Sequence, residues 1–285
     1  MENLGLVLEG GGMRGVYTAG ILDFFMDKDL YFSYVIGVSM GACNAASYVS
    51  KQRGRNKIID INYVNDKRYL SYRRLLLKKE LFGMDFIFEE IPNSLEIFDF
   101  DTFYNAKERF VIGVTDCNSG KPLYFEKNQC KDNVLKVIRA SSSLPLLNSI
   151  VNYENLQLLD GGISDPIPIK KSIEDGNSKN VIILTRNRGY IKKPFKLKLL
   201  LKFIYPKYKG LINALINRYK IYNETIKYIE KLEKEGKVFV IRPKETLEVR
   251  RVERDKKKLT CLYDQGYEEG KRCYDELQNW MFKIK

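Results

Sequence analysis

Apolar runs alternate with glycine-rich or polar turns along the first 50 residues of the chain. Residues 4–9 (LGLVLE) form a short apolar run that is typical of a buried strand. Residues 16–29 carry apolar side chains at helical spacing, residues 34–39 form a second apolar run, and residues 40–50 predict a helix of small residues. This β–loop–α–β–turn–α order is typical of a parallel sheet with crossover helices.

The rest of the chain continues to mix strands and helices. Residues 55–105 are helical and aromatic in pattern, and residues 109–127 predict two strands around an Asn-Ser-Gly turn. Further strands are expected at 156–162, 180–187 and 237–243, and further helices at 132–142, about 211–235 and about 258–282. The pattern therefore predicts an α/β fold in which a mostly helical region follows the main sheet.

Positive charge is concentrated after residue 185. The 285-residue chain has a net charge of +13, and residues 186–220 hold eleven basic residues and no acidic one. We therefore divide the chain into a main domain, 1–185, and a basic, mostly helical C-terminal region, 186–285, that packs on it. Tyr, Phe and Leu side chains among the cations predict that segment 186–220 makes a peripheral contact with anionic membrane. A solvated basic face that packs its apolar side on the main domain is the alternative, and no nucleic-acid module is recognised, so no nucleic acid is expected as a partner.

The cysteines and the chain start suggest a compartment. The five cysteines are odd in number and form no CxxC pair, so we expect reduced thiols in a cytoplasmic protein. The absence of histidine also disfavours a zinc site. The first residues do not resemble a signal peptide, and no apolar stretch approaches the ~20 residues that span a bilayer.

A glycine-rich loop follows the first predicted strand, in the order Gly10, Gly11, Gly12, Met13, Arg14, Gly15. The spacing fits a dinucleotide-binding fingerprint, a loop of backbone N–H groups that stabilises an oxyanion, or a simple tight turn. A dinucleotide fold expects an acidic residue at the end of the next strand. That strand ends in a serine flanked by Gly37 and Gly41, which favours the oxyanion loop.

Ser39 is the candidate nucleophile. It stands between an apolar strand and a small-residue helix, and Gly37 and Gly41 permit the strained turn of a nucleophile elbow. A helix N-cap is the alternative role for this serine. Because the chain has no histidine and no Ser-x-x-Lys at this position, a carboxylate is the remaining candidate base. Burial would raise its basicity above that of a free aspartate, whose pKa is about 3.9.

Asp160 is the candidate for that carboxylate. It ends an apolar run and precedes Gly161 and Gly162, and in a parallel sheet we expect it beside Ser39 at the carboxyl ends of the strands. An Asx turn is the alternative role for Asp160. The competing carboxylates are Asp99, Asp101, Asp116 and Asp165.

Four motifs together resemble the patatin-like phospholipase family over roughly residues 4–185. They are the glycine loop 10–15, the Gly-x-Ser-x-Gly at 37–41, the Ala-Ser-Ser-Ser-Leu-Pro at 140–145 and the Asp-Gly-Gly at 160–162. The resemblance implies a three-layer α/β/α sandwich with a mainly parallel central sheet, and hydrolysis of acyl esters, often of phospholipids, without metal or cofactor. It also implies that Ser39 is the nucleophile, Asp160 the base and the loop from Gly10 to Gly15 the oxyanion hole.

Two other functions remain open from the sequence. The glycine loop alone would suit a non-catalytic protein that binds a nucleotide or a lipid. The same serine chemistry would also suit an acyltransferase, in which an acceptor other than water takes the acyl group.

Overall fold

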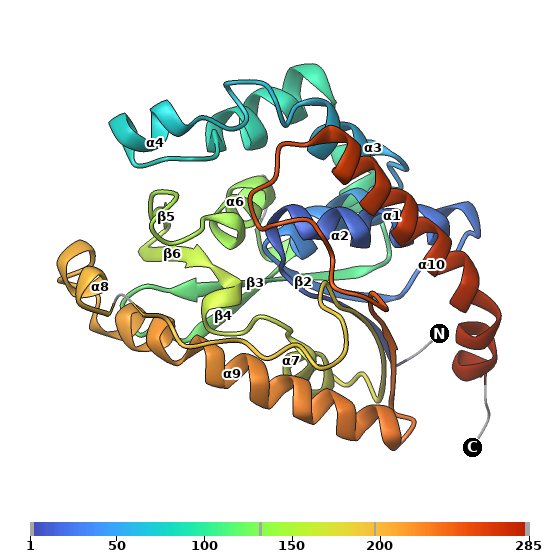
Figure 1. Cartoon of the computed structure of the whole chain (residues 1–285). Helices are drawn as coiled ribbons and strands as arrows, with labels where there is room; N and C mark the ends of the chain where they lie inside the picture. The colour runs from blue at the N-terminus through green and yellow to red at the C-terminus, as the bar shows by residue number, and fades with distance from the viewer. Residues whose placement is uncertain (1–2, 131–132, 197, 283–285) are drawn as a thin grey trace.

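The computed structural model describes residues 3–130, 133–196 and 198–282. Its centre is an eight-stranded mixed sheet of order β5-β6-β3-β2-β1-β7-β8, with β4 paired to β3 off this path. Figure 1 shows helices covering both faces of this sheet. The strands are β1 (Leu4–Leu8), β2 (Tyr34–Val38), β3 (Arg109–Asp116), β4 (Pro122–Glu126), β5 (Val151–Tyr153), β6 (Leu156–Asp160), β7 (Lys179–Ile183) and β8 (Val238–Ile241).

Two helical layers bury the sheet because its strands are apolar on both faces. In β1, Leu6 and Leu8 belong to one hydrophobic cluster and Val7 belongs to another. One layer contains α1 (Val16–Asp27), α2 (Met40–Val49), α6 (Val134–Ser142) and α10 (Lys256–Phe282), and the other contains α7 (Ile169–Glu174) and α9 (Lys209–Lys234) (Figure 1). The predicted three-layer α/β/α fold is confirmed.

The sheet is parallel in one part and antiparallel in the other. β8, β7, β1, β2 and β3 run parallel, whereas β4 and β6 each pair antiparallel with β3. The expectation that Asp160 ends a strand parallel to β2 is therefore wrong. The strand that carries Asp160 runs in the opposite direction, because the connections through β4, α6 and β5 return the chain to the edge of β3 that β2 occupies, just past the end of β2.

Helix α10 packs closely on α1 and brings the C-terminal region to the main sheet. A Cβ at Gly266 would lie 2.0 Å from the carbonyl oxygen of Tyr17, and one at Gly20 would lie 2.1 Å from that of Tyr263. Glycine at both positions therefore allows the two helix backbones to touch. The division at residue 185 stays a prediction, and β8 of the later region continues the same sheet.

Short helices fill the connections. They are α3 (Arg55–Lys57), α4 (Tyr72–Lys78), α5 (Phe100–Asn105) and α8 (Lys198–Ile204), the π-helices η2 (Ile58–Asn62) and η3 (Phe86–Leu95), and the 3-10 turns η1 (Gly12–Gly15), η4 (Lys127–Gln129) and η6 (Gly161–Ile163). Helix α4 lies within the segment 70–82, whose two ends are joined by an antiparallel bridge between Leu70 and Phe82.

Candidate active site

Ser39 occupies the turn between β2 and α2. Its backbone has φ 56° and ψ −129°, a conformation that costs a non-glycine residue about 1–3 kcal/mol. A Cβ at Gly37 would lie 2.7 Å from the backbone of Gly41, and a Cβ at Gly41 would lie 2.6 Å from the carbonyl oxygen of Leu8. The two glycines therefore allow the strand and the helix to approach, and the turn has the conformation of a nucleophile elbow.

The C-terminal end of α6 holds this turn in place. The backbone N–H of Ser39 donates to Ser141 Oγ at 2.8 Å, and Ser141 Oγ donates to the carbonyl oxygen of Gly113 at 2.6 Å. Two residues later, the carbonyl oxygen of Ser143 accepts the backbone N–H of Asp160 at 2.9 Å. The sequence analysis placed these serines in a motif but did not predict their hydrogen bonds to the turn and to Asp160. The signal that could have indicated them is the run of three adjacent serines at the end of a predicted helix.

The glycine loop lies directly against Ser39. A Cβ at Gly10 would lie 3.1 Å from Ser39 Cβ and 3.0 Å from the carbonyl oxygen of Val38, and a Cβ at Gly15 would lie 2.3 Å from Met40 Cγ. Side chains at these positions would fill the space between the loop and the elbow, so glycine is needed for the close approach.

The loop leaves two N–H groups available. Met13 donates its N–H to the carbonyl oxygen of Arg251 at 3.1 Å, whereas the N–H groups of Gly11 and Gly12 have no backbone acceptor among the described residues. Gly12 has φ +57°, which favours glycine. The side chain of Arg14 is buried and lines a separate cavity that also includes Gly10.

Asp160 has one carboxylate oxygen without a partner. Its side chain is 1% exposed, and Oδ1 accepts the N–H of Gly162 at 2.8 Å. Oδ2 is buried and accepts no hydrogen bond, which is true of no other carboxylate among the described residues. A Cβ at Gly161 would lie 2.1 Å from the carbonyl oxygen of Gly113, so the turn after Asp160 also requires glycine.

The competing aspartates are occupied or exposed. Asp99 caps α5 through the N–H of Thr102, and Asp101 is exposed. Asp116 accepts the N–H and hydroxyl of Ser119 in the β3–β4 turn. Asp165 accepts the Tyr124 hydroxyl at 2.6 Å, and burial raises the pKa of Asp165 to about 6. None of these four has a buried oxygen left free as Asp160 does.

Ser39 and Asp160 lie along the same edge of β3. Val38, the residue before Ser39, pairs with Gly113, and Asp160 pairs with the next residue, Val114, on that edge, because β4 occupies the opposite edge at both positions. No hydrogen bond joins Ser39 Oγ to Asp160 within the described chain, so the assignment of these two residues as a dyad remains a prediction.

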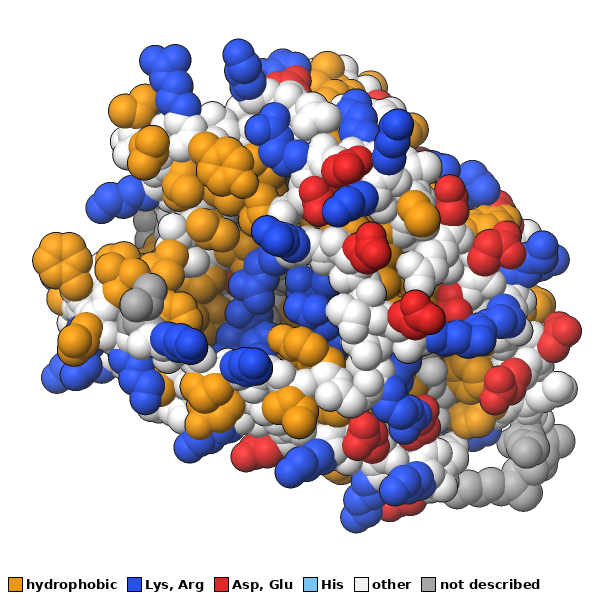
Figure 2. Space-filling view, viewed as in Figure 1, with side chains coloured by type: hydrophobic (Ala, Val, Ile, Leu, Met, Phe, Trp, Pro, Cys, Tyr) orange, Lys and Arg blue, Asp and Glu red, His pale blue; other side chains and the backbone are white. Residues whose placement is uncertain are grey.

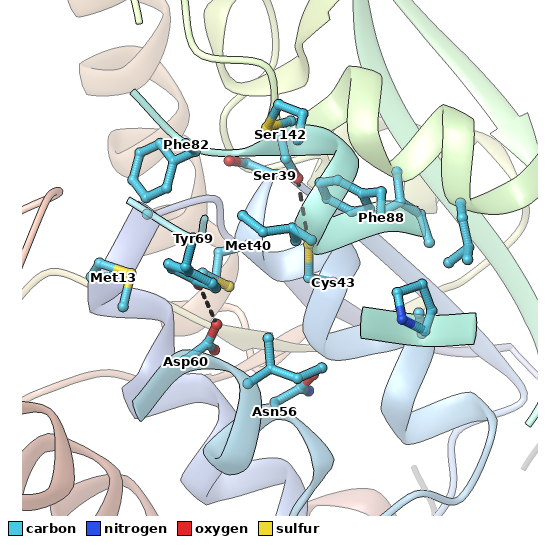
Figure 3. A pocket seen from close by; sticks show the side chains of 18 of the residues that line it. Met13, Ser39, Met40, Cys43, Asn56, Asp60, Tyr69, Phe82, Phe88 and Ser142 are labelled. Carbon is cyan, nitrogen blue, oxygen red and sulfur yellow. Dashed lines mark hydrogen bonds between the residues drawn. The ribbon is translucent and has the colours of Figure 1, made fainter. Parts of the chain in front are cut away.

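An apolar pocket opens beside Ser39 (Figure 3). It contains about 840 Å³ of empty space. Its walls include Met13, Met40, Phe82, Phe88, Leu135 and Leu144. Asp60 and Tyr69 also line it, and the Tyr69 hydroxyl donates to Asp60 Oδ1 at 3.1 Å. Burial raises the pKa of Asp60 to about 7, although the Tyr69 hydrogen bond and the charge of Arg55 oppose this shift.

Family models match both parts of the chain. A model described as "Patatin-like phospholipase" matches residues 6–172. A second, described as "Domain of unknown function (DUF6363)", matches residues 208–282.

Related proteins include one bacterial and one viral sequence. Uncharacterized protein YjjU of Escherichia coli (strain K12) is 29% identical over 250 residues, which are 86% of this chain and 69% of that protein. Probable lipid hydrolase 463L of Invertebrate iridescent virus 6 is 28% identical over 199 residues, 61% of this chain and 65% of that protein. The crystal structure of VipD from Legionella pneumophila matches 97% of this chain and 67% of its own with a TM-score of 0.50 and 12% identity, a likeness of fold alone.

Proposed function

Because the chain belongs to the patatin-like phospholipase family, we propose that it is a serine acyl hydrolase that cleaves carboxylic esters of lipids through Ser39 and Asp160. Membership of the family, whose motifs the sequence carries, makes the protein a hydrolase. A relative named as a probable lipid hydrolase supports a lipid substrate.

In the proposed reaction, Ser39 Oγ attacks the ester carbonyl carbon while Asp160 Oδ2 takes its proton. The N–H groups of Gly11 and Gly12 stabilise the negative charge that develops on the carbonyl oxygen. Collapse of this intermediate releases the alcohol, which takes the proton from Asp160, and leaves an acyl group on Ser39. Asp160 then deprotonates a water molecule that attacks the acyl carbonyl carbon. The bond to Ser39 Oγ breaks, Oγ takes the proton back from Asp160, and the carboxylic acid leaves.

The free oxygen of Asp160 is the observation that carries this proposal. A buried carboxylate oxygen without a hydrogen bond is costly to the fold, because it gives up water and gains no partner. Fixed by Gly162 on its other oxygen, the carboxylate presents Oδ2 in a defined direction. A structural aspartate would use both oxygens, as the competing aspartates illustrate with Asp116 and its three donors.

The apolar pocket supports a long-chain acyl substrate. Ser39 stands at its wall, and methionine, leucine and phenylalanine side chains supply most of the remaining surface. Burying an alkyl chain there is favourable by about 0.8 kcal/mol for each CH₂ group. The bound chain would place its ester carbon at Ser39.

We also propose that α4 and α8 contact an anionic membrane, as part of a cytoplasmic protein bound peripherally. Leu76 and Phe203 are each 85% exposed, and Leu77 and Leu199 are also exposed. Lysine and arginine side chains flank all four in the sequence. Figure 1 shows α4 and α8 toward the same edge of the molecule. No helix in the described ranges combines the length and apolar character needed to cross a bilayer.

The loop of α4 connects this surface to the pocket. Tyr69 and Phe82 line the apolar pocket, and the bridge between Leu70 and Phe82 closes the base of the loop. A lipid leaving the bilayer beneath α4 would therefore meet the pocket first. Such an entry path is consistent with a substrate taken from a membrane.

Hydrolysis of a p-nitrophenyl ester tests the proposed dyad. We expect Ser39→Ala and Asp160→Asn each to abolish turnover while circular dichroism and the melting temperature stay near those of the wild type. Asp116→Asn is the matched control, because it changes the same group outside the site and should retain turnover. Activity retained in either of the first two variants would refute the dyad, and a product analysis that shows acyl transfer to an added alcohol would favour the acyltransferase.

A further inference from the structure

The apolar pocket beside Ser39 has one polar wall. Most of its lining is methionine, leucine, isoleucine and phenylalanine, but four polar side chains also belong to it, and we name them the polar wall: Arg55, Asn56, Asp60 and Tyr69. Figure 3 shows Asp60 and Asn56 on the side of the pocket away from Ser39. A chain whose ester lies at Ser39 therefore passes apolar side chains before it meets the polar wall.

Asp60 is the member of the polar wall with an oxygen left open. Its side chain is 4% exposed, and Oδ1 accepts the Tyr69 hydroxyl at 3.1 Å. No hydrogen bond reaches Asp60 Oδ2 in the described parts of the chain. Unlike Asp160 Oδ2, this oxygen is not fully enclosed by protein atoms, and the open space that it meets is the pocket.

The other polar side chains of the wall are held by their neighbours. Asn56 Oδ1 accepts the Ser47 hydroxyl at 2.8 Å. One terminal nitrogen of Arg55 donates to the carbonyl oxygen of Glu96 at 3.0 Å, and the other donates to Ser47 Oγ at 3.4 Å. Arg55 forms no ion pair with Asp60 or with any other carboxylate that the structure describes. The nearby cation thus leaves Asp60 Oδ2 open to the pocket.

The carboxyl group of Asp60 can bind a hydroxyl in either protonation state. Burial raises the pKa of Asp60 to about 7, so below that pH the group carries a proton. Because Oδ1 accepts from Tyr69, that proton belongs on Oδ2, from which it can be donated into the pocket. In the ionised form, Oδ2 accepts a hydrogen bond instead. A hydroxyl, which both donates and accepts, therefore matches Asp60 on either side of neutral pH.

An unsubstituted alkyl chain suits this wall poorly. Packed in the pocket, it would remove water from Asp60 Oδ2 and offer no hydrogen bond in return, which is unfavourable for a polar group. A chain with a hydroxyl at the right carbon would keep the apolar contacts and supply the missing partner. Sites that hydrogen-bond a substrate group discriminate strongly against an analogue that lacks the group.

We propose that Asp60 binds a hydroxyl group on the acyl chain, so that esters of hydroxylated fatty acids are better substrates than unsubstituted esters of the same length. This inference rests on the proposed hydrolase function and adds selectivity for the acyl chain. Figure 2 shows hydrophobic side chains gathered beside α4 on this face of the molecule, whereas Asp60 and Tyr69 are buried. A chain that approaches from this face therefore meets apolar surface first, and its hydroxyl is recognised inside.

Hydrolysis of matched fluorogenic esters tests the selectivity. The substrates are 4-methylumbelliferyl octadecanoate and a series of its isomers that each carry one hydroxyl at a different carbon of the chain. We expect kcat/KM of the wild type to be at least tenfold higher for one or more of the hydroxylated esters. Asp60→Leu should abolish this preference and retain cleavage of the unsubstituted ester. Asp60→Asn should keep the preference, because an amide both donates and accepts.

Asp175→Leu is the matched control. Asp175 also accepts a tyrosine hydroxyl, that of Tyr34 at 2.8 Å, but it follows α7 in the opposite helical layer and does not line the pocket. This variant should lower the melting temperature and leave the preference unchanged. A wild type that prefers no hydroxylated isomer would overturn the inference, and so would a preference that survives in Asp60→Leu.

Calorimetry separates this inference from the proposed reaction. In the Ser39→Ala protein, the hydroxyoctadecanoic acid whose ester is preferred should bind at least tenfold more tightly than octadecanoic acid, and the additional change Asp60→Leu should remove the difference. If the hydrolase function were wrong, no ester would be cleaved, and the series of hydroxylated acids would still contain one that binds more tightly through Asp60. Equal affinity for octadecanoic acid and for every hydroxylated acid would overturn the inference while leaving the hydrolase function intact.

Discussion

Ser141 connects the nucleophile turn to the central sheet. Its hydroxyl accepts the backbone N–H of Ser39 at 2.8 Å and donates to the carbonyl oxygen of Gly113 at 2.6 Å. Ser141 is fully buried, so water cannot replace either bond. This hydroxyl therefore positions Ser39 relative to β3, and Asp160 lies along the same edge of that strand.

Ser141→Ala is expected to lower kcat for a p-nitrophenyl ester about tenfold or more, with little change in KM. The variant leaves the N–H of Ser39 buried and unpaired, at a cost of about 1–3 kcal/mol. Ser172→Ala is the control, because Ser172 is also buried and donates to Asn180 Oδ1 at 2.5 Å away from the site. We expect the control to lower the melting temperature with kcat retained. A normal kcat in Ser141→Ala would show that this hydroxyl does not position the nucleophile.

Asp60 is expected to make the protein less stable as the pH rises. Its pKa in the folded chain is about 7, above the ordinary value of 3.8, because burial disfavours the charged form. The folded state therefore holds a proton that the unfolded chain releases, and stability is lost as the pH rises from about 4 to about 7. Asp60→Asn should raise the melting temperature more at pH 8 than at pH 5.

Thermal unfolding of both proteins across this pH range checks the Asp60 prediction. Asp66→Asn is a useful control. Hydrogen bonds with Arg68 lower the pKa of Asp66, so its charged carboxylate stabilises the folded chain, and Asp66→Asn should lower the melting temperature where Asp60→Asn raises it. A gain from Asp60→Asn that is the same at pH 5 and pH 8 would mean that Asp60 is already charged in the folded protein at pH 5.

The exposed apolar side chains of α8 are expected to carry membrane binding. Replacing Leu199 and Phe203 together by serine should reduce co-sedimentation with vesicles of phosphatidylglycerol and phosphatidylcholine several-fold, because both side chains would otherwise enter the lipid interface. Phe282→Ser is the control, since Phe282 is similarly exposed at the end of α10, away from α8 in Figure 1. Equal losses in both proteins would contradict a role specific to α8.

The local sequence was sufficient to predict the elbow and most elements. Ser39 follows an apolar run and is flanked by Gly37 and Gly41, and these three positions determine the turn that the structure contains. Helices α9 and α10 begin within two residues of their predicted starts, because hydrophobic periodicity over more than 20 residues is a strong signal.

The direction of β6 could not be predicted from its residues. An apolar run that ends in Asp160 looks the same in a parallel or an antiparallel strand, and direction depends on how the chain between β3 and β6 folds back. The role of Ser141 was missed for a related reason, because its partners Ser39 and Gly113 are distant in sequence. Contacts between distant segments are decided by packing, which no local pattern encodes.

The basic residues of segment 186–220 lie in two different environments. Arg186, Lys192 and Arg218 line the small cavity that also includes Gly10 and Arg14, whereas Lys198 and Lys202 are exposed on α8. Charge counting along the chain cannot separate these two groups. Arg251 also lines this cavity but lies beyond the predicted segment, and it reaches the cavity because the chain before α10 passes the glycine loop.

Labelling with a fluorophosphonate, followed by peptide mass spectrometry, tests the central claim most directly. The probe reacts with an activated serine and needs no knowledge of the natural substrate. We predict that the wild-type protein is labelled at Ser39, and that Asp160→Asn lowers the labelling rate by at least 100-fold while Asp116→Asn leaves it unchanged. Labelling at another serine, or an equal rate at Ser39 in the Asp160→Asn protein, would contradict the assignment of Asp160 as the base that activates Ser39.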